Sequence, residues 1–470
     1  MSDSILQSAL PTRPRTRSMG LKLIVVCALA LFMTIPALFV DSLVDERMKR
    51  ESDVVQEISG HVGGQQTFLG PTLAIPYTIP WKSPEAPGRS GIYLVFPAQA
   101  SADVKTTTEE RRRSLFKVPV FTADVKFDAM FDLTGVPAAL PLGAELDWSR
   151  AEMVVGASDA RGAKADATLA SGGTLVTLTP AAIAPDLTIG GDPNQRVKLT
   201  LFGTNVNAIA KAGAQFRVSS SLKFSGAQRI ALLAYGKTTQ LAMQGDWRSP
   251  GFDGGFLPTS RSLYNNGYSA AWQVPFIARG VRAEGVADSI NGLDATAMGL
   301  SFIEVADPYQ SVTRSLKYAL LFVGLLFITY FVFEVTTGKR VHPAQYILVG
   351  VAQIIFYLLL LSLAERIGFD WAFLLGGSAT VGLLSANAGW IFASRAQVLR
   401  ALAVFSSLYT LIYLLLRLED NALLVGAIAS FLAVGIAMYF TRSIDWYSSL
   451  PGATDDDGRV SVVPRTTAAS

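Results

Sequence analysis

The feature that most constrains this chain of 470 residues is the placement of its long hydrophobic segments. One lies near the N-terminus and five lie in the C-terminal third, with a mostly polar stretch between them. A helix needs about 20 apolar residues to cross a hydrocarbon core about 30 Å thick. The predicted spans are residues 20–42, 316–335, 344–363, 371–392, 399–416 and 421–440. We therefore expect an integral membrane protein with six transmembrane helices.

The first hydrophobic segment has the basic flank and apolar core that a cleaved signal peptide also has. It is long enough to span the bilayer, and no small-x-small cleavage site follows it, because the segment exits through Phe39, Val40 and Asp41. We interpret it as a membrane helix that the charged stretch 43–59 extends outward.

Lysine and arginine residues near the ends of the spans predict their direction, because cytoplasmic loops carry the excess of these residues. Arg13, Arg15, Arg17 and Lys22 precede or begin the first span, which places the N-terminus in the cytoplasm. With alternating crossings, the loops predicted inside are basic and the short loops predicted outside are neutral or acidic. The large segment 43–315 is then outside, and both termini are inside.

The stretch between the first two spans carries the signals of β-strands. Apolar and polar side chains alternate over residues 121–131 and again over 216–224, which is typical of half-buried strands. Shorter strands are predicted at 92–96, 174–179 and 198–202, with breaks rich in glycine and proline such as 251–258. We predict a mostly antiparallel β-sandwich, or a pair of related β-lobes. The expected fold class is an α-helical membrane bundle of 1+5 helices with a large β-rich domain inserted between helices 1 and 2.

Few residues support catalysis or metal binding. The two histidines, His61 and His342, have no second histidine or cysteine nearby, whereas a zinc site needs three or four such ligands. The chain contains no G-x-S-x-G, phosphate-binding or H-E-x-x-H motif. Its net charge of +3 is not typical of a nucleic-acid-binding protein. We predict no catalytic, cofactor-binding or metal-binding residues, and therefore no enzyme.

Two groups of residues have a functional and a structural interpretation. The loop 245–258 combines glycines and carboxylates with Trp247 and Phe256. It is either an ordered loop whose rings pack into the domain, or a loop that binds a partner or ligand. At the inner end of the second span, Glu334 either has a structural role, in which it snorkels or pairs with Lys339 (Arg340 is also near), or belongs to a proton relay.

Small residues recur every four positions on two predicted membrane helices, and such stripes let helices approach closely. The first stripe consists of Ser378, Gly382 and Ala386, with Asn387 beside it. The second stripe consists of Ala429, Ala433 and Ala437. We predict that the two stripes pack against each other, and that Asn387 forms a hydrogen bond across the contact.

Several short strings occur in an order and at a spacing similar to those of a known family. They are GPTLAIP at 70–76, DARG at 159–162, FLP at 256–258, DPYQ at 307–310, HPAQYILVG at 342–350 and RSIDWY at 442–447. Through these strings, residues 20–447 resemble the CreD family of bacterial inner-membrane proteins. The resemblance implies a location in the inner membrane, with the β domain in the periplasm, and a link to cell-envelope integrity. It implies no established reaction.

Polar and aromatic residues gather near the predicted membrane boundaries. They are Tyr309, Arg314, Lys317, Glu334, His342, Gln345, Tyr346 and Asp445. These residues either mark a functional site or serve as interfacial anchors and loop caps.

The predicted domains are a basic cytoplasmic arm (1–19), the first transmembrane helix (20–42), a periplasmic β-rich domain (43–315), a five-helix bundle (316–441) and a cytoplasmic tail (442–470) that is disordered after about residue 448. Three functions fit this layout. In the first, the protein maintains the envelope without catalysis, and its β domain binds an envelope protein, a lipid or a cell-wall component. In the second, the bundle transports a lipid or small molecule. In the third, the protein is a sensory or regulatory subunit that signals through the loop containing His342.

Overall fold

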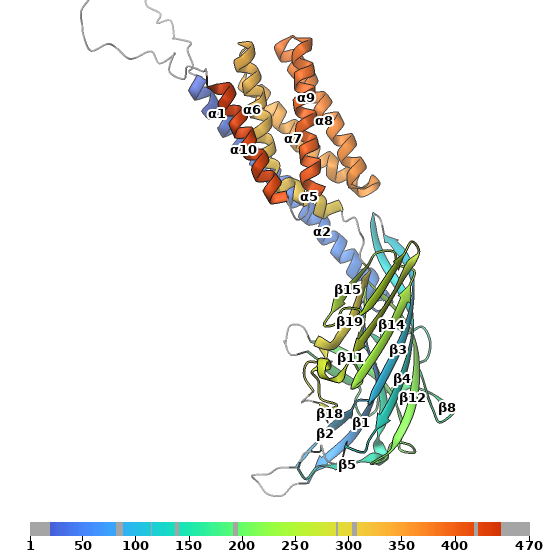
Figure 1. The fold of residues 1–470 in the computed structure, drawn as a ribbon. Coiled ribbons are helices and arrows are strands. Elements are labelled where there is room, and N and C mark those ends of the chain that lie inside the picture. Colours follow the sequence, from blue (N-terminus) through green and yellow to red (C-terminus); the bar gives the residue numbers. More distant parts are fainter. Residues whose placement is uncertain are drawn as a thin grey trace, which may run out of the picture. The chain divides into compact units, whose positions relative to one another are not determined.

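The computed structural model describes residues 19–80, 88–113, 115–136, 140, 142–190, 196–287, 290–302, 308–417 and 422–442. The chain divides into two compact units (Figure 1). The helical unit comprises Met1–Met48 and Ala306–Ser470, and the β domain comprises Lys49–Val305. A β-rich domain together with several apolar helices confirms the predicted fold class.

Most of the helices of the helical unit are long and apolar, and α5 is short. The helices are α1 (Met19–Phe32), α2 (Thr34–Val62, which has residues in both units), α5 (Pro308–Lys317), α6 (Ala319–Thr337), α7 (Pro343–Ile367), α8 (Phe369–Phe392), α9 (Arg395–Arg417) and α10 (Ala422–Thr441). Within the described residues, five segments are long and apolar enough to cross a membrane, namely α1 with α2, α6, α7, α8 and α9. Helix α10 coincides with the sixth predicted span but is not among these five. Six crossings and their directions therefore stay predictions.

The first helical segment is interrupted at Met33, between α1 and α2. Pro36 lies in the first turn of α2 and has no N–H to donate to the preceding turn, which accounts for the interruption. Helix α2 then continues past residues 43–59, so the expected extension of the first helix is confirmed. Gly63 and Gly64 follow its last residue with φ of 95° and 59°, a conformation that favours glycine.

A short helix precedes the second long hydrophobic helix. The sequence predicts a span from residue 316, but α5 ends at Lys317, and Tyr318 separates it from α6. Tyr309, Val312 and Leu316 are buried at spacings of three and four, so α5 presents one apolar face. This face packs mainly against α7 and α9. The long apolar helix therefore starts at Ala319.

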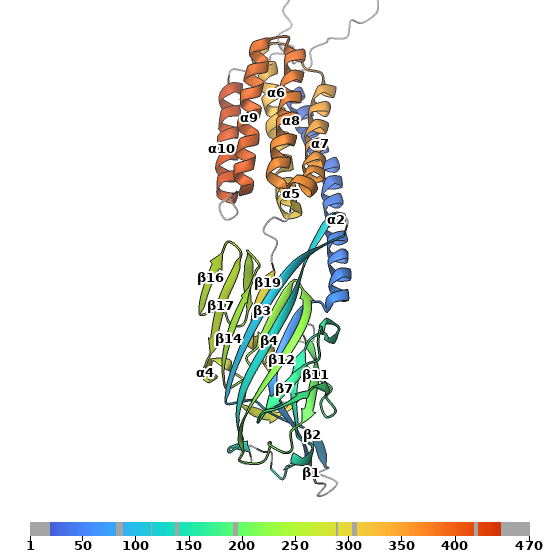
Figure 2. The same cartoon turned by 90° about the vertical axis from the view of Figure 1, so that its right-hand side faces the viewer.

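The β domain is a sandwich of two sheets. The strands are β1 (Gln66–Ile79), β2 (Arg89–Val95), β3 (Gln99–Arg113), β4 (Phe116–Asp132), β5 (Glu145–Leu146), β6 (Glu152–Ala157), β7 (Thr168–Ser171), β8 (Thr174–Thr177), β9 (Thr179–Pro180), β10 (Asp186–Ile189), β11 (Val197–Asn205), β12 (Gln215–Ala227), β13 (Arg229–Leu233), β14 (Thr238–Gly245), β15 (Pro250–Gly254), β16 (Ser260–Tyr264), β17 (Gly267–Val274), β18 (Glu284–Val286) and β19 (Ala297–Phe302). The eleven-stranded sheet has the main path β10-β11-β6-β1-β13-β19-β15. The eight-stranded sheet has the order β16-β17-β14-β3-β4-β12-β7-β8 (Figure 2). Among the described strands, only the pairs β1–β13 and β3–β14 are parallel.

One hydrophobic core joins the two sheets. Phe68 on β1 packs edge-on against Phe224 on β12, with 5.4 Å between ring centroids, and these strands belong to different sheets. The domain is therefore a single sandwich and not a pair of lobes. The two clearest predicted strands, 121–131 and 216–224, lie in β4 and β12, which are antiparallel neighbours in the smaller sheet.

The sequence prediction missed strands whose burial does not alternate evenly. The first half of β3 buries every second residue, but its end at 109–113 is exposed and carries five charges in a row. Strand β15 lies in the segment 251–258 that was predicted as a break. It ends the path of its sheet, and an edge strand tolerates the proline and glycines that β15 contains.

Candidate functional site

Among the described residues of the helical unit, the most buried charge is the carboxylate of Glu334 on α6, whose side chain is 1% exposed. Lys22 on α1 forms an ion pair with its Oε1 atom, and the Lys22 ammonium also donates to the carbonyl of Val341 at 2.7 Å. The hydroxyl of Tyr346 on α7 donates to Oε2 at 3.2 Å. A buried charge needs such partners, because removing it from water costs several kcal/mol.

The predicted pairing of Glu334 with Lys339 is wrong. Lys339 follows the end of α6, and its ammonium donates instead to the carbonyl of Phe392 at 2.5 Å. Gly338 ends α6 in the left-handed conformation, with φ of 67°, before the chain reaches Lys339. The partner comes from a helix 312 residues away in the sequence. The sequence held a signal for this partner, because Lys22 is the one charged residue between Gly20 and Val40.

The Lys22–Glu334 pair joins α1 to α6, which, together with α7, is a neighbour of α1. At the other end of α1, the side chain of Met33 lies so close to Gly350 on α7 that an added Cβ there would be 2.6 Å from its sulfur. Phe327 on α6 lies on the same side, 3.2 Å from that position. Because these contacts are eleven residues apart, they are separated by about 16 Å along the helix axis. Glu334 therefore helps to attach α1.

Asn387 on α8 forms a hydrogen bond between helices, but it bonds to α6 and not across the predicted contact with the sixth span. Its amide donates to the hydroxyl of Tyr330 on α6 at 3.2 Å, and that hydroxyl donates to the carbonyl of Leu384 at 2.8 Å. The predicted stripe beside Asn387 is not the contact, however. Ser378 is exposed, and nothing lies within 4 Å of a Cβ added at Gly382.

The face of α8 that packs is a different row of residues. It contains Gly376, Thr380, Leu384 and Ala388, all buried, and Gly376 lies against Phe356 on α7. The row also repeats every four positions, so spacing alone does not distinguish it from the exposed stripe. The side chains of Ala429, Ala433 and Ala437 on α10 lie outside the described residues, so that stripe is not tested.

Tyr309 and His342, two further candidate residues at the membrane boundaries, lie at opposite ends of α7. Tyr309 on α5 donates to the carboxylate of Glu365 at 2.9 Å, and the guanidinium of Arg47 lies 3.9 Å from the same oxygen. His342 caps the start of α7, because its Nδ1 accepts from the N–H of Ala344 at 3.2 Å.

The structure brings Glu334 and Tyr346 together and places Tyr309 and His342 at separate helix ends. The remaining four boundary candidates are Arg314, Lys317, Gln345 and Asp445. Arg314 and Gln345 are half-buried, and Lys317 is exposed. Asp445 lies outside the described residues.

Trp247 and Phe256, the two ring residues of loop 245–258, both pack against the core of the β domain. The ring of Trp247 lies 5.9 Å from that of Phe302 in an edge-to-face arrangement, and its N–H donates to the carbonyl of Ser249 at 3.2 Å. The carbonyl of Phe256 accepts from the indole of Trp272 at 3.0 Å. These contacts give both rings a packing role and fix the chain on either side of β15.

A hollow of about 380 Å³ lies next to this loop, and its wall is formed by Arg248, Tyr264, Asn265 and Asn266. All four side chains are exposed. Among the described residues, Arg248 forms no ion pair. Arg248 belongs to the loop 245–258 that the sequence analysis singled out, but Tyr264, Asn265 and Asn266 were not singled out, because they form no motif.

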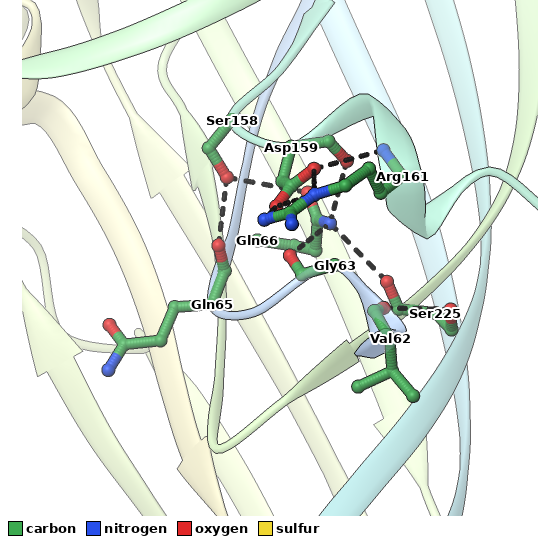
Figure 3. A network of polar contacts seen from close by, with 8 residues as sticks. All are labelled: Val62, Gly63, Gln65, Gln66, Ser158, Asp159, Arg161 and Ser225. Carbon is green, nitrogen blue, oxygen red and sulfur yellow. Dashed lines mark hydrogen bonds and ion pairs between the residues drawn. The ribbon is translucent and has the colours of Figure 1, made fainter. Parts of the chain in front are cut away.

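A second polar cluster joins α2 to the sandwich (Figure 3). The amide of Gln66, which is 0% exposed, donates to the carbonyls of Gly63, Asp159 and Ser225 at 2.8, 3.0 and 3.3 Å. The side chain of Arg161 binds the carboxylate of Asp159, which lowers the pKa of that carboxyl. The 159–162 string thus has a structural role, because it closes the domain around the end of α2.

Two comparisons with known proteins agree with this architecture. A family model described as "Inner membrane protein CreD" matches residues 18–447, which include both units. The "Inner membrane protein CreD" of Escherichia coli (strain K12) is 29% identical over 452 residues, which cover 92% of this chain and 96% of that protein. These matches confirm the resemblance drawn from short strings. The chain belongs to the CreD family of inner membrane proteins.

Proposed function

We propose that this protein supports cell-envelope integrity as a non-enzymatic binding module. Its helices anchor it in the inner membrane with both termini in the cytoplasm, and its β domain binds an envelope protein or lipid in the periplasm. The observation that carries the proposal is the open edge of the eight-stranded sheet at β16.

Strand β16 ends its sheet, and all five of its residues are exposed. Its outer backbone groups face no further strand of the described residues, and such an edge is a template for pairing with another chain. Leu263 and Tyr264 add apolar surface, with 58% and 60% of their side chains exposed. The hollow next to Arg248 adjoins the end of this strand. The β16 edge, the two apolar side chains and the hollow together form one continuous surface that a partner can bind.

The helical unit supports the anchoring part of the proposal. Its buried carboxylate is paired with Lys22 and Tyr346, and Asn387 is bonded to Tyr330. Each of these contacts joins two helices and so has a structural use.

A photo-reactive amino acid at Leu263 of the full-length protein tests the proposal in intact cells. The matched control carries the same residue at Leu175, which is 69% exposed on β8, the opposite edge of the same sheet. We expect a discrete envelope adduct from position 263 and not from 175. Equal adducts at both positions would contradict the proposal. So would a deletion strain whose detergent sensitivity is unchanged under conditions in which the wild-type strain expresses the protein.

A second candidate function is transport by the helical unit. The observation in its favour is a carboxylate buried among apolar helices, since intramembrane ionisable residues are often functional. The double variant Lys22→Met with Glu334→Gln removes both charges and keeps similar volumes. If the protein transports a substrate through this charged pair, the double variant should lose envelope function although it folds normally. The binding-module proposal expects that function to persist.

A further inference from the structure

The hollow at Arg248, Tyr264, Asn265 and Asn266 combines an aromatic ring, two carboxamides and a cation, and contains no carboxylate. We propose that it binds an acidic sugar, meaning a saccharide ring that carries a phosphate or carboxylate group. The inference deepens the proposed function, because it assigns a ligand class to the same surface of the β domain.

The lining side chains match the three chemical features of such a ligand. Tyr264 offers an aromatic face on which the C–H bonds of a sugar ring can pack, and its hydroxyl can bond at the edge. The carboxamides of Asn265 and Asn266 both donate and accept hydrogen bonds, as sugar hydroxyls do. The guanidinium of Arg248 presents a planar fork that binds carboxylate or phosphate through two parallel bonds.

The backbone that carries these side chains is fixed on both sides. Asn265 and Asn266 form the two-residue turn between β16 and β17, in which Tyr264 pairs with Gly267. Gly267 has φ of 149°, and an added Cβ would lie 2.1 Å from the carbonyl of Gly245, so the turn closes tightly against β14.

The two residues before Arg248 are fixed by contacts outside the loop. Asp246 accepts from the N–H and the hydroxyl of Thr108 at 2.9 and 2.7 Å, so its carboxylate is already bonded. Trp247 is held by its contact with Phe302. The backbone that carries the lining side chains is therefore ordered before a ligand binds, which lowers the free-energy cost of ordering the site.

The size and openness of the hollow favour binding of one end of a larger molecule. The hollow has a volume of about 380 Å³ and is widely open to solvent. Because all four lining side chains are exposed, a bound sugar keeps one side in solvent. The rest of a glycan, or the lipid that carries it, can continue outward from there.

Binding is measured on the full-length protein in nanodiscs, by calorimetry with three probes. N-acetylglucosamine 1-phosphate carries a phosphate, N-acetylmuramic acid carries a carboxylate, and N-acetylglucosamine is the neutral control. We expect at least one acidic probe to bind at least tenfold more tightly than the neutral sugar. Arg248→Gln should remove that preference, and Tyr264→Ala should weaken binding of every sugar that binds.

The matched control is Arg261→Gln, which removes a neighbouring exposed arginine that lies 6.0 Å above the ring of Phe252 and outside the hollow. It should leave the preference unchanged. The inference is overturned if no acidic sugar binds up to millimolar concentration, or if Arg248→Gln and Arg261→Gln bind alike. Adducts from position 263 that persist in either case would show that the proposed function survives without this ligand.

A second arm distinguishes the sources of the sugar. Nanodiscs that contain lipopolysaccharide with a phosphorylated core are compared with nanodiscs that lack it. If lipopolysaccharide competes with the soluble probe in wild type and not in Arg248→Gln, the ligand is lipid-linked. If only soluble probes bind, the same site takes a free acidic sugar. Both results support the inference and name its source.

Discussion

The ion pair that attaches α1 gives the sharpest test of the helical unit. In Lys22→Met, an unbranched apolar side chain replaces the ammonium, and Glu334 keeps one donor, the hydroxyl of Tyr346 at 3.2 Å. The carbonyl of Val341 also loses its donor at 2.7 Å. Breaking a buried pair on one side typically costs about 3–5 kcal/mol, because it leaves a charge without a partner. Arg13, Arg15 and Arg17 remain to orient the first span.

Adding Glu334→Gln should restore most of that stability. The double variant has no buried charge, and replacing both members of such a pair is often nearly neutral. We expect the double variant to be more stable than Lys22→Met alone by about 2 kcal/mol or more, so the two substitutions are strongly coupled.

The assay measures the free energy of unfolding of the full-length protein in bicelles for wild type, both single variants and the double variant. A second readout follows α1 directly, through a disulfide between Met33→Cys and Gly350→Cys in a Cys27→Ser background. Lys22→Met should slow formation of this disulfide, and the double variant should recover it. The reasoning is refuted if Lys22→Met lowers the free energy of unfolding by less than about 1 kcal/mol. It is also refuted if the effects of the two substitutions on that free energy are additive.

Three further predictions use contacts described above. Gly350→Leu should destabilise the helical unit, whereas Gly382→Leu should leave its thermal stability unchanged, because only the first glycine has a side chain against it; equal melting temperatures would contradict this. Gln66→Ala should cost about 1–3 kcal/mol, since buried carbonyls lose their donor, as chemical denaturation of the full chain can measure. The lowered pKa of Asp159 stabilises the fold above the carboxyl's unfolded pKa, and this contribution is lost as pH falls through the folded value. Arg161→Ala should therefore lower stability at neutral pH more than at about pH 2, and an equal loss at both would exclude the linkage.

Local patterns predicted much of the fold. The alternation over 121–131 and 216–224 identified β4 and β12, because one face of each strand is buried and the other is exposed to solvent. The length of the apolar runs located the helices, since hydrocarbon thickness sets that length. Pro343, whose ring fixes φ, and Gly338, which adopts a positive φ, mark helix ends independently of tertiary contacts.

The sequence did not predict which faces and charges meet. On α8, Gly376, Thr380 and Leu384 pack while Ser378 and Gly382 do not, although both rows repeat every four residues. The neighbours α7 and α9 decide between them. Local spacing offered Lys339 as a partner for Glu334, but the true partner lies on α1.

The hollow was not predicted for a related reason. Arg248 and the turn at Asn265 and Asn266 come together only because β14, β15, β16 and β17 fold back on one another. None of these residues stands out in composition or spacing. A site built from single residues at strand ends becomes visible only in three dimensions.

The most direct test of the central claim is mass spectrometry of the proteins, lipids and glycans that are co-extracted with the full-length chain in native nanodiscs. Wild type is compared with Leu263→Lys on the β16 edge and with Leu175→Lys on the opposite edge. If the β domain is the binding module, one companion is present in wild type and Leu175→Lys and absent from Leu263→Lys. A companion that all three chains retain equally would contradict binding through this edge.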